Sequence, residues 1–114
     1  LVIDDEASVL EIVAEVLSAH GHSVTVAHGG REGLLAFSAG RFDLVMTDLG
    51  MPDLNGWDVV RSIKESRTAT PVLVLTGWGD TAEAPAGVRP DGFLTKPFDL
   101  KRLAAEVGAV ISRA

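Results

Sequence analysis

Short apolar runs and longer amphipathic stretches alternate along this chain. Each apolar run stops after a few positions at turn-forming or charged residues, which is typical of a β-strand. Strands are therefore predicted over residues 1–3, 23–27, 43–48, 71–76 and 92–96. The run Pro71–Thr76 is apolar at every interior position, which indicates burial on both faces, as in a parallel sheet.

The stretches between these runs repeat apolar residues with the spacing of an α-helix. Helices are predicted over residues 7–20, between Gly30 and Gly40, over 57–66 and over 100–112. A further helix is expected within residues 79–90. It should be short or irregular, because this segment contains Pro85, Gly87 and Pro90.

Strand and helix alternate along the whole chain, which favours right-handed crossovers and a parallel sheet covered on both faces. The predicted class is α/β, and five strands in 114 residues fit a doubly wound, flavodoxin-like sheet of order 2-1-3-4-5 better than a barrel. One domain should span residues 1–114. The chain starts in what looks like the middle of a strand, so either a few residues of that strand are missing or the domain was cut from a longer protein.

Acidic residues follow the first and third predicted strands. Asp4 and Asp5 come directly after residues 1–3, and Asp48 ends the strand 43–48. In the order 2-1-3-4-5 these two strands are neighbours at the switch point, where a crevice opens at their carboxyl ends. Topology therefore brings three carboxylates together, and their oxygens suit a hard divalent ion such as Mg²⁺.

Two more strand ends bring a hydroxyl group and a cation to this crevice, namely Thr76 and Lys96. Together with a divalent ion they can offset the charge of a phosphoryl group, for which an aspartate can be the nucleophile. Each residue also has an ordinary explanation. An aspartate can begin a turn or cap a helix, a threonine fits any strand, and a lysine is usually solvated. Their joint placement at the ends of four strands favours the functional interpretation.

Composition narrows the classes of function. Hydrophobic residues make up 46% of the chain, which is too many for a disordered protein, yet no apolar run approaches the ~20 residues of a membrane span. The formal net charge of −6 argues against direct binding of nucleic acid by this domain. The chain has no cysteine, which excludes disulfides and thiolate metal sites and agrees with a cytoplasmic location.

Four motifs at the strand ends cover nearly the whole chain. They are Val2-Ile3-Asp4-Asp5-Glu6, Asp48-Leu-Gly-Met-Pro-Asp-Leu-Asn-Gly56, Leu75-Thr76-Gly77 and Phe93-Leu-Thr-Lys96-Pro97-Phe98. In this order and spacing they resemble the response-regulator receiver domains of two-component signalling. The resemblance implies a phosphorylation-dependent switch rather than an enzyme in the ordinary sense. Its partners would be a sensor histidine kinase or phosphotransfer domain, and an output domain or a second copy of the chain.

The resemblance also implies roles for individual residues. Asp48 would be the phospho-acceptor. Asp5, Asp48 and the backbone carbonyl of Gly50 would bind Mg²⁺, and Asp4 would contribute through a metal-bound water.

The phosphoryl oxygens would be contacted by Thr76 and Lys96. Phe93 would be the aromatic switch, although without a hydroxyl group it cannot make the hydrogen bond that a tyrosine could make at the rim. The peptide bond between Lys96 and Pro97 would be cis, and proline is the residue at which cis bonds are tolerated.

Two further hypotheses concern exposed or loop residues. Trp78, two residues after Thr76, should lie beside the site and limit the access of water to an acyl phosphate. Ile12 lies at the edge of the apolar arc of the first predicted helix, where an exposed, partly apolar patch would suit docking of a kinase.

Two other classes of function remain as alternatives. An aspartyl-phosphate hydrolase or phosphotransferase of the haloacid-dehalogenase type needs a second acid two residues after the nucleophile, and that position is Gly50. A flavin-binding domain could use the same crevice, but its acidic residues would repel the flavin phosphate.

Overall fold

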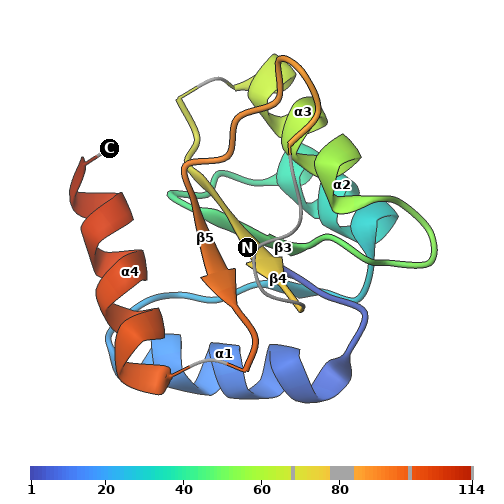
Figure 1. Ribbon diagram of the computed structural model, residues 1–114. Coiled ribbons are helices and arrows are strands. Elements are labelled where there is room, and N and C mark those ends of the chain that lie inside the picture. Colours follow the sequence, from blue (N-terminus) through green and yellow to red (C-terminus); the bar gives the residue numbers. More distant parts are fainter. Residues whose placement is uncertain (68, 78–83, 98, 114) are drawn as a thin grey trace.

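The computed structural model describes residues 1–67, 69–77, 84–97 and 99–113. Within these residues, strands and helices alternate along the chain (Figure 1). In chain order the elements are β1 (Val2–Ile3), α1 (Ala7–Ala19), β2 (Val26–Ala27), α2 (Gly30–Ala39), β3 (Val45–Asp48), α3 (Gly56–Ser66), β4 (Val72–Thr76), β5 (Gly92–Thr95) and α4 (Leu100–Arg113).

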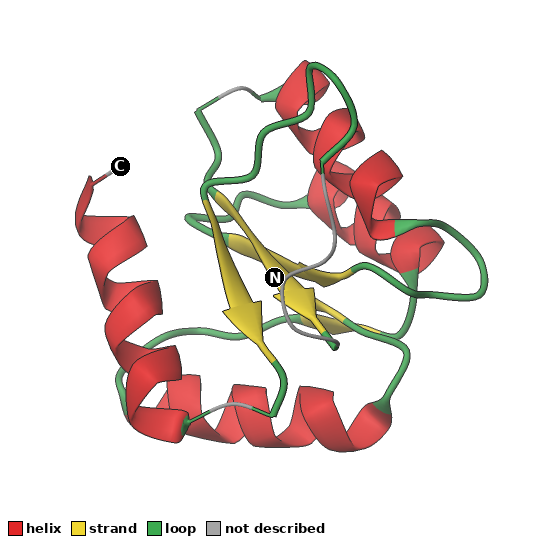
Figure 2. Cartoon of the chain, in the orientation of Figure 1, coloured by secondary structure: helices red, strands yellow, loops and turns green. Residues whose placement is uncertain are grey.

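The strands form one parallel sheet in the order β2-β1-β3-β4-β5. The predicted class, order and direction of the strands are therefore confirmed. The helices lie on both sides of the strands (Figure 2). As predicted, β1 and β3 are neighbours, with Ile3 opposite Thr47 in the register.

Each face of the sheet buries its own hydrophobic cluster, because successive side chains of a strand point to opposite faces. In β4, Val72 and Val74 pack on the side of α2 and α3, whereas Leu73 and Leu75 pack on the side of α1 and α4. All four side chains are fully buried, which explains the uninterrupted apolar run in the sequence.

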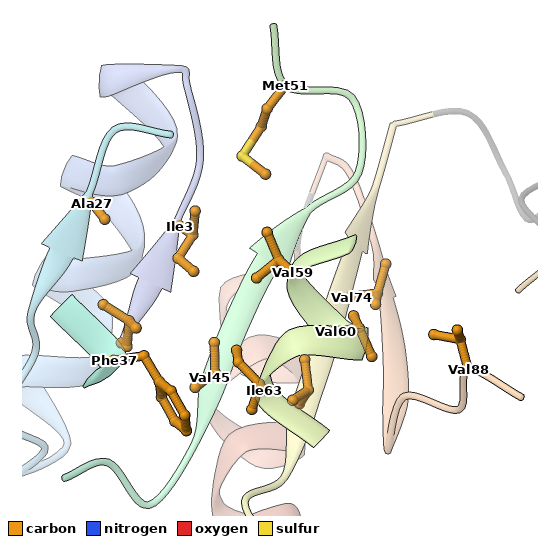
Figure 3. Close-up of a cluster of buried hydrophobic side chains, with 12 residues drawn as sticks. Ile3, Ala27, Phe37, Val45, Met51, Val59, Val60, Ile63, Val74 and Val88 are labelled. Atoms are coloured by element: carbon orange, nitrogen blue, oxygen red, sulfur yellow. The ribbon is translucent and has the colours of Figure 1, made fainter. Parts of the chain in front are cut away.

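The cluster under α2 and α3 contains side chains from four of the strands and from both helices (Figure 3). Val59 and Ile63 of α3 lie over Val45 and Val74 of the sheet, and all four are fully buried. Burying side chains of this size stabilises the fold by about 1.5–3 kcal/mol each. This packing holds β3 and β4 rigidly beneath the loops at their carboxyl ends.

Some predicted boundaries were wrong. The second strand covers only Val26–Ala27 rather than residues 23–27, although it is the edge strand that the sequence suggested. In the segment expected to form a short helix, residues 84–90 contain a turn, with the Val88 N–H donating to the Pro85 carbonyl, and no helix. Residues 79–83 of that segment lie outside the described residues.

Candidate functional site

Three carboxylates meet at the carboxyl ends of β1 and β3, as the topology predicted. One oxygen from each of Asp4, Asp5 and Asp48 lies within 4.8 Å of the others. Asp4 is fully buried and Asp48 is 8% exposed, whereas Asp5 faces solvent. The cluster therefore has two buried carboxylates and one, that of Asp5, which solvent can reach.

Lysine 96 provides the positive charge beside this cluster. Its Nζ lies 2.7 Å from Asp4 Oδ2 and 3.6 Å from Asp48 Oδ1. The alternation of side chains along a strand explains why these three residues lie close together. Each of them stands two positions after a buried residue of the hydrophobic cluster under α1 and α4, and so points to the same side of the sheet. Those buried residues are Val2, Met46 and Leu94.

Both oxygens of the Asp4 carboxylate accept hydrogen bonds. Its Oδ1 accepts a hydrogen bond from the Glu6 N–H at 2.9 Å, and its Oδ2 accepts one from Lys96 at 2.7 Å. Glu6 itself is the residue that precedes α1, and its side chain makes no capping hydrogen bond. The Asp4 carboxylate thus organises the start of α1 and the lysine at once.

On balance, the surroundings of Asp48 disfavour the negative charge of its carboxylate. Burial raises the pKa of Asp48, and the nearby charge of Asp4 raises it further, while Lys96 and the Leu49 N–H act in the opposite direction. Burial alone would lower the pKa of Lys96, but its hydrogen bond to Asp4 and the charges of Asp4, Asp48 and Glu6 hold that pKa above its usual value. Lys96 is therefore a fixed cation, and the site still carries excess negative charge.

The loop after β3 returns close to the site. The Gly56 N–H donates to the Leu49 carbonyl at 2.9 Å, and Gly50 pairs with Asn55 in an antiparallel bridge. A Cβ atom on Gly56 would collide with the Asp48 carbonyl, so only glycine permits this close return. Gly50 is exposed on the loop, two residues after Asp48.

Thr76 ends β4 and is 5% exposed. It follows Val74 by two positions, so the alternation of the strand directs its side chain to the α2 and α3 side of the sheet. Asp48 and Lys96 follow the pattern of the opposite side. The structure therefore brings the acids and the lysine together, and Thr76 ends the neighbouring strand β4 at the same edge of the sheet.

Phe93 lies opposite Val74 in the register of β4 and β5, on the same face as Thr76. Its side chain is 45% exposed and packs edge-on against Trp57, with ring centroids 6.2 Å apart. The bond between Lys96 and Pro97 is cis. Trp78, which the sequence placed beside the site, lies outside the described residues.

Two residues near the site carried no predicted role. Glu6 Oε1 lies 3.8 Å from Lys96 Nζ, so a third carboxylate, after Asp4 and Asp48, shares this cation. Asp53 reaches from the loop after β3 to the start of α2. The position of Glu6 directly after Asp5 was a usable signal, but the contact of Asp53 spans 22–23 residues and depends on how the loop folds.

The fold and these charges define a class of protein. It is a flavodoxin-like α/β domain whose switch point holds three carboxylates beside a lysine. The carboxylate oxygens are donors that suit a hard cation.

Comparison with known proteins specifies the family. The family model described as the response regulator receiver domain matches residues 1–108. The response regulator MprA of Mycolicibacterium vanbaalenii is 38% identical over 99% of this chain and 50% of its own length. The transcriptional regulatory protein TcrA of Mycobacterium tuberculosis is 35% identical over 99% of this chain and 46% of its own length. The chain belongs to the receiver domains of response regulators, which are switches of two-component signalling.

Solved structures agree with this assignment. The chemotaxis response regulator CheY4 of Vibrio cholerae superimposes with a TM-score of 0.89 at 29% identity, covering 96% of this chain and 94% of that one. The receiver domain of NtrX from Brucella abortus gives 0.91 at 27% identity, covering 99% and 98%. The chain spans about half the length of the curated relatives it matches. Among the described residues, no helix has the length and apolar character to cross a bilayer.

Proposed function

We propose that Asp48 accepts a phosphoryl group from a phosphohistidine of a sensor kinase or phosphotransfer domain. The observation that carries this proposal is the position of Asp48. Its nearly buried carboxylate ends a central strand, and the ammonium group of Lys96 lies 3.6 Å away. Asp4 is also buried beside Lys96, but both of its carboxylate oxygens already accept hydrogen bonds, one from the Glu6 N–H and one from Lys96.

In the proposed transfer, an Asp48 oxygen attacks phosphorus and forms the P–O bond of an acyl phosphate. The P–N bond to the donor imidazole breaks, and its electron pair stays on the imidazole nitrogen. Burial and the charge of Asp4 raise the pKa of Asp48, whereas Lys96 and the Leu49 N–H stabilise the carboxylate anion that would attack. Lys96 would then offset charge on the phosphoryl oxygens as they enter the site.

The residues present fit a Mg²⁺ ion. The donors are carboxylate oxygens, Asp5 is exposed and accessible, and Asp48 shares the same cluster. Both Asp4 oxygens already accept hydrogen bonds, which is consistent with a contribution through water rather than by direct contact. The Gly50 carbonyl would complete the protein ligands. When bound, the ion would neutralise negative charge shared between the carboxylates and the phosphoryl group.

The surface beside Lys96 supports a docking role. A groove of about 560 Å³ lies between the start of α1 and the segment before α4, lined in part by Ile12, Pro97 and Leu100. Ile12 is 41% exposed and Leu100 43% exposed. An apolar groove that reaches Lys96 would let a helical partner present its phosphohistidine to Asp48. In this role the domain would work in the cytoplasm, as its lack of cysteine suggests.

The output of the switch would pass through the other face of the sheet. Thr76 would turn toward the phosphoryl oxygens, and Phe93, now packed outward against Trp57, would follow into the vacated space. An attached output domain would read this change. The curated relatives are about twice as long as this chain, and several are named transcriptional regulators, which makes a DNA-binding output domain our expectation for the whole protein.

Hydrolase chemistry of the haloacid-dehalogenase type is less well supported. Gly50 has no side chain, and at this position that chemistry uses an acid to protonate the leaving group and activate water.

The direct test is phosphorylation by acetyl phosphate, followed by intact-mass spectrometry. The native protein should gain one phosphoryl group in Mg²⁺ and none in EDTA, and Asp48→Asn should gain none in either. Asp58→Asn removes an exposed carboxylate from the start of α3 and should label like the native protein. An adduct of equal yield on Asp48→Asn would refute the assignment.

A further inference from the structure

The amino end of α2 is capped by a side chain from a distant part of the chain. Gly29, which precedes the helix, has no side chain to accept hydrogen bonds from its first turn. Asp53, in the loop between β3 and α3, supplies both acceptors. Its Oδ1 accepts from the Gly30 N–H at 3.1 Å, and its Oδ2 accepts from the Arg31 N–H at 2.9 Å. This contact ties the loop to α2 (Figure 1).

Two glycines at the start of α2 make room for this contact. A Cβ atom on Gly29 would lie 3.0 Å from Asp53 Oδ2, and one on Gly30 would lie 2.6 Å from Leu54 Cβ. The backbone N–H groups of Arg31 and Gly30 lower the pKa of Asp53, so its carboxylate is charged and accepts at neutral pH. The loop and α2 are therefore held together by shape as well as by hydrogen bonds.

The same loop carries the Gly50 carbonyl. At the base of the loop, the Gly56 N–H donates to the Leu49 carbonyl. On its inner side, Met51 is 8% exposed and points toward the core beside Val59 (Figure 3). Asp53 adds the contact with α2, so three contacts restrain the loop that carries Gly50.

We infer that Asp53 is a positioning residue for the metal site, because it holds the loop of residues 49–55 against α2 and so restrains the Gly50 carbonyl before Mg²⁺ binds. The inference rests on the proposed function, in which this carbonyl is a ligand. A loop that is already ordered loses less conformational entropy on binding, and affinity rises accordingly. The stability of α2 and the affinity for Mg²⁺ would therefore depend on one side chain.

The test is a titration with Mg²⁺ in the absence of a phosphodonor. The amide chemical shifts of residues 49–55 report binding. Asp53→Ala should raise the Kd for Mg²⁺ about fivefold. This is less than the roughly 10–100-fold loss typical for groups bonded directly to a metal ligand, because Met51 and Gly56 still hold the loop. Asp53→Asn keeps one acceptor oxygen, so its Kd for Mg²⁺ should fall between those of the native protein and Asp53→Ala. Asp58→Ala removes the same charge from the first turn of α3 and should leave the Kd unchanged.

A second variant reaches the same contact from α2 and covers the case in which Asp53→Ala folds poorly. Gly29→Ala should crowd the Asp53 carboxylate and also weaken Mg²⁺ binding, but it should add little to Asp53→Ala, because the contact is already gone. If Asp53→Ala lowers the melting temperature with an unchanged Kd, Asp53 is only a helix cap and the inference is wrong. Additive effects of the two substitutions would also overturn it. Native protein without saturable Mg²⁺ binding would refute the metal site itself.

Discussion

Replacing Asp48 by asparagine should stabilise the fold in the absence of divalent ions. The oxygens of the three carboxylates lie within 4.8 Å of one another. At an effective dielectric constant of about 20, two charges at this upper limit repel by roughly 3.5 kcal/mol, and the attraction of Lys96 at 3.6 Å is roughly 4.6 kcal/mol. Asp48 faces two such repulsions, from Asp4 and Asp5, against one attraction. Solvent screens the exposed Asp5, so we expect a net gain of about 1 kcal/mol for Asp48→Asn, or roughly 4 °C in Tm.

The assay is urea and thermal unfolding of both proteins in EDTA and in Mg²⁺. At ten times its Kd, Mg²⁺ should add about 1.4 kcal/mol to the stability of the native protein. Asp48→Asn lacks a charged ligand and should gain much less, so the difference between the proteins should shrink or reverse. Asp58→Asn, which removes a charge from an exposed ion pair with Arg61, serves as the control and should respond to Mg²⁺ like the native protein.

The pH dependence gives an independent check. Because the pKa of Asp48 is raised in the folded state, the native state binds its proton at a higher pH than the unfolded state does. The advantage of Asp48→Asn should therefore be full above the folded pKa. It should decline as the pH falls and vanish below about 3.9, where aspartate is protonated in both states. An Asp48→Asn protein that is less stable than the native one in EDTA at pH 7 would refute the reasoning.

Three other predictions follow from particular contacts. Ile12→Glu should slow phosphoryl transfer from the cognate kinase at least tenfold yet leave labelling by acetyl phosphate unchanged. The control Leu35→Glu, on the exposed face of α2, should affect neither reaction. Equal loss in both assays would show that Ile12 has a structural role. Thr76→Ala should accept phosphate but show weaker amide shifts around Phe93 on adding beryllofluoride, and full shifts would exclude Thr76 as the coupling residue. Leu103→Ala, at a fully buried position of α4, should cost about 2–5 kcal/mol in urea unfolding, and a cost below 1 kcal/mol would contradict the packing.

Much of the fold could be predicted because it depends on periodicity and topology. The continuous apolar run of β4 requires burial on both faces, and the alternation of strands and helices leaves few ways to arrange a parallel sheet. The strand order 2-1-3-4-5 by itself places Asp4, Asp5 and Asp48 at one edge of the sheet, where the structure has them together. The sequence alone was therefore enough to predict that these three carboxylates lie in one crevice.

Tertiary structure decided how those residues face one another. The sequence could not show that Lys96 lies 2.7 Å from Asp4 but 3.6 Å from Asp48, because that difference depends on side-chain conformation across three strands. The tie between Asp53 and the start of α2 was likewise hidden, since a turn-forming aspartate has the same local sequence whether or not a helix end lies nearby. Local sequence determines which elements form, whereas contacts between distant segments depend on how those elements pack, and packing is a property of the whole chain.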